Sequence, residues 1–165
     1  MVTRINEFSS SGNAHIPSAK GLTFGIVVSD WNHEITEKLS DQAFQTLKSH
    51  GAHENDIFLN HVPGSIELTL GAQFLAEYNT MNAIICLGCV IQGETRHFDY
   101  VCDSVTQGIT QLNLKYNIPF IYGVLTTKDT EQALERAGGR YGNKGSEAAV
   151  AAIRMAHLKK SLKGS

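Results

Sequence analysis

Hydrophobic residues along this chain fall into two alternating patterns. Apolar-rich runs at residues 22–28, 57–62, 83–87 and 120–125 have the composition of parallel strands that are covered on both faces. Each run is followed by a segment in which apolar residues recur every three or four positions, as they do on one face of an amphipathic helix. The pattern therefore predicts four strands, each followed by a helix.

Capping and helix-breaking residues mark the ends of the predicted helices. Asn32 suits the N-cap of the first helix, and Gly51 suits its end. The second helix is predicted at residues 66–78, and three of its residues are expected to face the core: Leu70, Phe74 and Leu75. The remaining helices are predicted from His97 to about Asn117, at residues 130–137 before Gly138, and from about Lys144.

The alternation of strand and helix, with no internal repeat, predicts an α/β fold. We expect a three-layer αβα sandwich on a four-stranded parallel sheet of the flavodoxin-like kind, with right-handed crossovers. Residues 1–21 are polar and aperiodic, so they are expected to form an N-terminal arm, and residues 22–165 a single domain. Because such an arm cannot pack on its own, we expect the sheet edge of a neighbouring subunit to order it.

Composition narrows the class of protein. The chain has 165 residues, 42% of them hydrophobic, which is enough for one full core and too short to suggest two domains. A net charge of −2 argues against a nucleic-acid partner, and the basic tail at residues 157–163 is interpreted as a solvated helix end rather than a binding patch. No apolar run approaches the ~18 residues of a membrane span, so we expect a soluble, cytoplasmic protein.

The three cysteines, Cys86, Cys89 and Cys102, lie in predicted core elements, and their odd number favours a reducing compartment. Cys86 and Cys89 have the spacing of a redox or zinc motif. However, they end a strand rather than begin a helix, and no second Cys/His pair has ligand spacing. We therefore expect no metal and no redox cofactor.

The turns that follow the predicted strands are rich in functional groups, at Trp31 and Asn32 and at residues 65–67, 92–97 and 126–128. Carboxyl ends of parallel strands form the ligand-binding edge of open α/β sheets, so one site is expected there. The turn before His97 directs free backbone N–H groups and the positive end of a helix at a phosphate or carboxylate. His97 is a candidate general acid or base, because imidazole ordinarily titrates near neutral pH.

Each of these residues also has a plain structural interpretation. His97 can be a surface or capping residue, and Glu67 can be a first-turn residue favoured by the helix dipole. Glu135 and Arg136 can form a solvated ion pair. Trp31, the only tryptophan, either stacks on a ligand or packs on protein.

Several common ligand classes lack their motifs. The chain has no G-x-G-x-x-G and no Walker sequence, and the turn after the first strand is not the Ser/Thr/Gly-rich loop of FMN proteins. These absences argue against dinucleotides, nucleoside triphosphates and flavodoxin-type FMN binding.

Five motifs occur in the order seen in the lumazine synthase family, and the chain resembles that family from about residue 21 to 162. The motifs are residues 25–28 with Trp31 and Asn32, residues 62–67, 87–97, 120–127 and 135–145. The resemblance implies the penultimate step of riboflavin biosynthesis, with no metal or redox cofactor. In that step 5-amino-6-ribitylaminouracil condenses with 3,4-dihydroxy-2-butanone 4-phosphate through imine formation, phosphate loss and ring closure.

The resemblance also implies roles for the pyrimidine-binding residues. Trp31 would stack on the ring beside Asn32. The ribityl pocket would be lined by Ser65, Ile66 and Glu67, and the ring flanked by the backbone of Cys89, Val90 and Ile91.

The other half of the implied site would act on the phosphorylated substrate. His97 would transfer protons, and the phosphate would be held by the amides of Glu94 and Thr95 and by Arg136. Tyr122 would come from a neighbouring subunit, and Lys144 would lie near the pocket.

Three positions depart from the family pattern. Gln92 stands where the family often has a basic residue, which slightly weakens anion attraction. Ile66 replaces a common aromatic, and Trp31 replaces the usual phenylalanine, so both adjust the shape of the pocket. None of the three removes a presumed catalytic group.

The resemblance implies a homopentamer with active sites between subunits, and riboflavin synthase as a partner. The short connection at residues 137–145 favours further assembly into a sixty-subunit icosahedral shell. One alternative is a non-catalytic flavin-binding, lumazine-binding or shell-forming protein of the same fold, against which His97, Arg136 and Glu67 argue. Another is a flavodoxin-like signalling or electron-transfer domain, whose phosphoacceptor carboxylates and FMN loop are missing.

Overall fold

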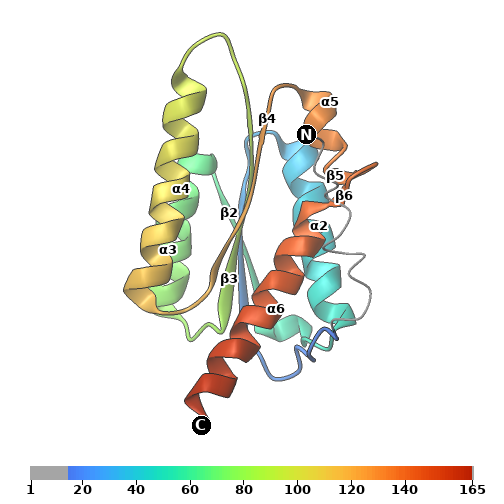
Figure 1. Ribbon diagram of the computed structural model, residues 1–165, viewed down its shortest axis with the longest axis vertical. Helices are drawn as coiled ribbons and strands as arrows, with labels where there is room; N and C mark the ends of the chain where they lie inside the picture. The colour runs from blue at the N-terminus through green and yellow to red at the C-terminus, as the bar shows by residue number, and fades with distance from the viewer. Residues whose placement is uncertain (1–14, 165) are drawn as a thin grey trace.

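The structure is a computed structural model that describes residues 15–164 (Figure 1). Its central sheet consists of four parallel strands in the order β2-β1-β3-β4, namely β1 (Phe24–Ser29), β2 (Ile57–Val62), β3 (Ala83–Ile91) and β4 (Phe120–Thr127). One face is covered by α3 (Leu68–Tyr78) and α4 (His97–Tyr116), and the other by α2 (His33–Ser49), α5 (Thr130–Leu134) and α6 (Lys144–Lys163). The predicted three-layer αβα sandwich is confirmed.

Strands β1, β3 and β4 divide their side chains between two separate cores, whereas the edge strand β2 has four exposed residues at its middle, 58–61. On β1, Val27 packs with residues of α3 and α4, whereas Ile26 packs with residues of α2 and α6. On β3, Cys86 and Ile85 divide between the two faces in the same way. Because helices cover both faces, both sets of positions must be apolar, which explains the apolar runs that mark these strands in the sequence.

Helices α2 and α6 pack against each other through small residues. The buried positions of α6 are mostly alanine: Ala148, Ala149, Ala152 and Ala156. At the start of α6, Gly145 lies so close to α2 that a Cβ atom would be 1.9 Å from the carbonyl oxygen of Leu39. The absence of a side chain at this position is therefore what allows the two helices to meet.

The buried face of α3 differs from the predicted one. Leu68, Ala72 and Leu75 are buried, but Leu70 and Phe74 are about half exposed, so only the prediction for Leu75 is correct. A short 3-10 turn, η2 (Ser65–Glu67), precedes the helix and sets its rotation against the sheet. Leu70 lies two residues beyond Leu68, about 200° around the helix at 3.6 residues per turn, and therefore points away from the sheet.

The predicted helix ends need two corrections. Asn32 occupies the N-cap position of α2, but its side chain makes no capping hydrogen bond and its backbone is left-handed, with φ 60°. The short helix predicted at residues 130–137 ends at Leu134 as α5. The chain then forms a small antiparallel hairpin of β5 (Ala137–Gly139) and β6 (Gly142–Asn143), in which Gly138 and Gly142 have positive φ angles that favour glycine.

Residues 15–21, the described part of the expected arm, lie against their own chain. Ala19 is buried, and its backbone N–H donates a hydrogen bond of 2.7 Å to the carbonyl oxygen of His50. Ile16 packs against the core, and Nε2 of His157 lies 2.6 Å from the carbonyl oxygen of Ser18. These contacts attach the segment to α2 and α6, and residues 1–14 lie outside the described residues.

Replacement of Gly145 by alanine should destabilise the protein. The added Cβ would meet two backbone atoms of Leu39, and neither can move without displacing α2. Alanine gains about 1 kcal/mol in helix propensity, but overpacking costs about 1–3 kcal/mol or more. Overpacking should prevail here, because a gap of 1.9 Å to backbone leaves no room for a side chain to adjust. Urea unfolding should show a lower midpoint.

The matched control is Gly93→Ala, because a Cβ at Gly93 would have no heavy atom within 4 Å. Its unfolding midpoint should stay at the wild-type value. A Gly145→Ala midpoint equal to that of Gly93→Ala would contradict the close approach of α6 to α2.

Candidate active site

A pocket of about 290 Å³ opens at the carboxyl ends of β1 and β3, between η2 and the first turn of α4. It is lined by Trp31, Gly64, Ser65, Ile66, Glu67, Cys89, Val90, His97 and Val101. Residues from three separate strand-to-helix turns thus meet in one place. This is the position where ligands bind in open parallel sheets.

Backbone packing beneath this pocket brings η2 close to the sheet. Gly88 of β3 has no side chain, and a Cβ at this position would be 2.8 Å from the hydroxyl oxygen of Ser65 and 2.9 Å from a methyl carbon of Leu68. The hydroxyl of Ser29, at the end of β1, would be 3.3 Å from the same atom; it is buried and has no hydrogen-bond partner among residues 15–164. A larger residue than glycine at position 88 would push η2, and with it Glu67, away from the pocket.

The turn between β3 and α4 has the features of an anion site. Gln92 closes β3 by donating its backbone N–H to the carbonyl oxygen of Thr127 over 2.8 Å. Among the described residues, the backbone N–H groups of Glu94 and Thr95 have no acceptor, and both residues are exposed. The twenty-residue helix α4 begins at His97, so its positive end faces the turn. These groups suit a phosphate.

A second pocket, of about 410 Å³, lies between β4 and α6. Its polar lining includes Tyr122, Arg136, Lys144 and Glu147. Nζ of Lys144 lies 2.6 Å from a carboxylate oxygen of Glu147, and the guanidinium of Arg136 donates to the carbonyl oxygen of Gln132 over 2.8 Å. Burial raises the pKa of Tyr122, so its phenol stays protonated at neutral pH. This pocket combines cations with an aromatic ring at the open edge of the sheet.

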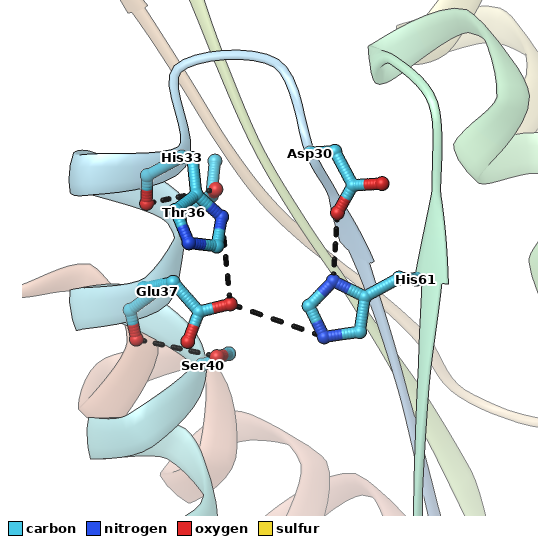
Figure 2. Close-up of polar contacts among 6 residues, drawn as sticks. All are labelled: Asp30, His33, Thr36, Glu37, Ser40 and His61. Carbon is cyan, nitrogen blue, oxygen red and sulfur yellow. Dashed lines mark hydrogen bonds and ion pairs between the residues drawn. The ribbon is translucent and has the colours of Figure 1, made fainter.

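A polar cluster lies next to the first pocket, at the ends of β1 and β2 (Figure 2). Nδ1 of His61 lies 2.8 Å from a carboxylate oxygen of Asp30, and Nε2 of the same ring lies 3.9 Å from Glu37. His33 approaches Glu37 from one turn earlier on α2, at 3.7 Å. All four side chains are at least one third exposed, so each pair contributes little to stability. The cluster ties the end of β1 to β2.

The chain can be placed by comparison with known proteins. A profile of the 6,7-dimethyl-8-ribityllumazine synthase family matches residues 21–160. The chain belongs to this family. The 6,7-dimethyl-8-ribityllumazine synthase of Parabacteroides distasonis is 54% identical over 158 residues, which are 96% of this chain and 99% of the relative. That of Cytophaga hutchinsonii is 55% identical over 146 residues, 88% of this chain and 92% of the relative. The resemblance stated from the motifs is confirmed.

The residues singled out by the lumazine synthase motifs do not all meet on one chain. Seven of the nine residues around the first pocket come from that set: Trp31, Ser65, Ile66, Glu67, Cys89, Val90 and His97. Three others line the second pocket instead: Tyr122, Arg136 and Lys144. Arg136, expected beside the amides of Glu94 and Thr95, thus shares a pocket with Tyr122, and the two pockets have no lining residue in common.

Two of the remaining motif residues point elsewhere. The partly buried side chain of Ile91 packs against the core on the α2 and α6 face of the sheet. Asn32 directs its amide nitrogen to the carbonyl oxygen of Cys89, 2.8 Å away. Neither side chain lines the first pocket.

Three polar residues near these pockets were not singled out from the sequence. Glu147 pairs with Lys144 one turn along α6, and this spacing of opposite charges could have indicated it. The ring of Tyr141 lies under the guanidinium of Arg136, at 4.9 Å. Arg96 adds a cation to the anion turn and is paired only loosely with Asp99, at 3.5 Å. The hairpin that brings Tyr141 to Arg136 leaves no periodic signal in the sequence.

Cys86 and Cys89 lie on opposite faces of the sheet, because side chains three residues apart on a strand point in opposite directions. They can therefore neither form a disulfide nor share a metal ion. Among residues 15–164, no group of three or more His, Cys, Asp and Glu side chains could hold a metal. No helix in the same range is long and apolar enough to cross a membrane.

Alkylation of the folded protein should be slow at every cysteine. Burial raises the pKa of Cys86 to about 12 and that of Cys89 to about 11, and burial together with Asp103 and Asp99 raises the pKa of Cys102. Because the thiolate is the nucleophile, iodoacetamide at about pH 7.5 should react with Cys86 and Cys89 at least about tenfold more slowly than with unfolded protein, where thiols have pKa values of about 8.5. Cys102 should also react more slowly than in the unfolded protein, because its pKa is raised in the same direction. The rate should increase as the pH rises toward these pKa values.

Mass spectrometry after timed quenching gives the rate for each site. Cys102, which is half-buried, should react before the two strand cysteines. A Cys102→Ser variant serves as the control that leaves only the buried pair. Fast labelling of Cys89 in that variant at about pH 7.5 would show that the thiol is not protected as described.

Proposed function

We propose that this chain condenses 5-amino-6-ribitylaminouracil with 3,4-dihydroxy-2-butanone 4-phosphate to form 6,7-dimethyl-8-ribityllumazine, releasing phosphate and water. The observation that carries this proposal is membership of the 6,7-dimethyl-8-ribityllumazine synthase family over almost the whole chain. The reaction belongs to riboflavin biosynthesis. The direct test is to mix the purified protein with both substrates and to follow the absorbance and fluorescence of the lumazine product.

The first pocket is the proposed site of the ribityl-pyrimidine. The indole of Trp31 is largely exposed at the rim, where a planar ring can stack on it. Glu67 offers a carboxylate to the ribityl hydroxyls, and Ser65 and Ile66 form the adjoining wall. The backbone of residues 89–91, at the end of β3, would hold the edge of the ring. A role for the backbone is consistent with the packing of β3 side chains into the two cores.

The phosphorylated substrate is proposed to bind in front of α4. The amides of Glu94 and Thr95 and the positive end of the helix would bind the phosphate. His97, which lines the pocket beside Val90, would then lie between phosphate and ring, where imine formation and phosphate loss each require proton transfer. The turn would stabilise the leaving phosphate, and the imidazole would move the protons.

Residues of the second pocket are proposed to complete the site of a neighbouring subunit. Arg136, Tyr122 and Lys144 lie at the β4 edge rather than with His97, so one chain holds two complementary halves. A ring in which the second pocket of one chain faces the first pocket of the next would unite them. We propose the pentameric ring of the family, with the short β5-β6 hairpin permitting assembly into a sixty-subunit shell.

The imidazole of His97 should be needed for full turnover. Loss of general acid–base help typically costs about a hundredfold or more in rate, so His97→Ala should lower kcat by that order unless the uncatalysed condensation masks part of the loss. The uncatalysed rate is measured in parallel and subtracted. His53→Ala is the matched control, because His53 precedes β2 at the opposite end of the sheet. Equal turnover of both variants would refute the role of His97.

Arg136 should act on the phosphorylated substrate and should act across the subunit boundary. A guanidinium matches phosphate geometry better than an ammonium. Arg136→Ala should therefore raise the KM of the butanone phosphate far more than that of the ribityl-pyrimidine, and Arg136→Lys should restore it only in part. Equal increases for both substrates would contradict the assignment to phosphate.

Mixing the two impaired variants, at a butanone phosphate concentration below the KM of Arg136→Ala, tests the shared site. If His97 and Arg136 of one site come from different chains, random 1:1 reassembly of His97→Ala with Arg136→Ala should leave about a quarter of the sites fully wild type. Light scattering before and after mixing verifies that both variants form the wild-type assembly. Assembled mixtures without recovered activity would place both residues of each site on one chain.

A further inference from the structure

Trp31 has little packing of its own to hold its ring in place. Its side chain is 73% exposed although it lines the first pocket. An exposed indole on a loop is free to sample several rotamers, and each wrong orientation lowers the fraction of protein that can stack on a ring. The orientation of Trp31 therefore depends on how firmly its backbone is held.

On one side, the segment is attached to the end of β2. The backbone N–H of Asp30 donates to the carbonyl oxygen of Val62 over 2.8 Å, and that of Trp31 donates to Pro63 over 3.2 Å. The carboxylate of Asp30 also contacts the ring of His61 in the polar cluster (Figure 2). These bonds orient the chain up to Trp31. However, β2 is an edge strand that does not line the pocket itself, and only the turn after it contributes, through Gly64 and the η2 residues.

On the other side, Asn32 makes the attachment to β3. Its backbone is left-handed, with φ 60° and ψ 43°, which reverses the chain directly after Trp31 and leads into α2. The carbonyl oxygen of Asn32 accepts the first helical hydrogen bonds, from Ile35 and Thr36. Its side chain makes no capping hydrogen bond to the helix. Instead, its amide nitrogen donates a hydrogen bond of 2.8 Å to the carbonyl oxygen of Cys89.

We propose that Asn32 is a positioning residue that fixes Trp31 over the pocket. The left-handed turn sets the direction of the indole, and the amide bond to Cys89 fastens that turn to the strand whose end lines the same pocket. This proposal rests on the proposed function, in which Trp31 stacks on the pyrimidine. It replaces direct ligand contact as the role of Asn32, because the amide donor already has a partner.

The two tasks of Asn32 can be separated by substitution. Glycine adopts the left-handed conformation at least as readily as asparagine but removes the amide. Aspartate keeps the shape and tolerates the conformation, but its carboxylate cannot donate to a carbonyl oxygen. A positioning role through the tether predicts that Asn32→Gly and Asn32→Asp are both impaired, whereas a purely conformational role predicts that glycine restores the wild type.

The chain offers a matched control in Asn117. Asn117 and Asn32 are the non-glycine residues with positive φ among residues 15–164, at 51° and 60°. Asn117 follows α4 and precedes β4, so it lies at the amino ends of the strands, opposite the pocket. Its carbonyl oxygen accepts a hydrogen bond from Lys159. Asn117→Gly therefore makes the same change in a left-handed turn without touching the pocket.

The first measurement uses Trp31 as its own probe, because it is the only tryptophan. Time-resolved fluorescence anisotropy of the ligand-free protein should show a larger amplitude of fast indole motion in Asn32→Gly and Asn32→Asp than in the wild type or Asn117→Gly. This result does not depend on catalysis. Equal amplitudes in all four proteins would overturn the proposal.

The second measurement separates substrate positioning from general damage. The KM of the ribityl-pyrimidine should rise about fivefold to tenfold in both Asn32 variants, the ratio expected for loss of one hydrogen bond, with a smaller change for the butanone phosphate. Wild-type KM in Asn32→Gly, or an equal rise in Asn117→Gly, would overturn the proposal. If the wild type shows no turnover, the proposed function fails, and the anisotropy still decides whether Asn32 fixes Trp31. If Asn32→Gly does not fold, the result for Asn32→Asp carries the test.

Discussion

Four strands run in the same direction in this sheet, and the site depends on that constraint. Parallel strands need a crossover between them, so helices cover both faces and every connection from a carboxyl end leads into a helix. The turns after β1, β2 and β3 therefore lie at one edge, where Trp31, Glu67 and His97 meet although they are far apart in sequence. The apolar strands and the polar turns are two consequences of one topology.

The order of the strands then divides the functional groups. β1 and β3 are central, so the turns that follow them face a common pocket. β4 is at the edge, and the groups on its open side, with Arg136 and Lys144 from the following elements, form a separate pocket. An edge strand with aromatic and cationic side chains beside it is a surface that another chain can cover. The proposed shared site follows from this separation.

Small residues and one asparagine provide the close approaches that the pocket needs. Gly88 admits the hydroxyl of Ser65 against β3, and Gly145 admits α6, which carries Lys144, against α2. Asn32 connects the Trp31 turn to β3 by a single hydrogen bond. Each acts on the site through backbone geometry rather than by touching a substrate. Substitutions at these positions are therefore expected to change binding constants and stability more than the rate of the chemical steps.

The sequence by itself determined the four strands of the sheet, the helices that follow them and the family, because strand and helix periods and the strand-end motifs are local properties of the chain. It predicted the turn before His97 for the same reason. It did not predict the β5–β6 hairpin, which has no periodic pattern. It did not determine which face of α3 is buried, since Leu70 and Leu68 are equally apolar and only contact with the sheet selects Leu68. Nor did it show that Arg136 lies apart from His97. The order of residues along a chain does not specify which strand ends at the sheet edge, and that placement results from packing between distant segments.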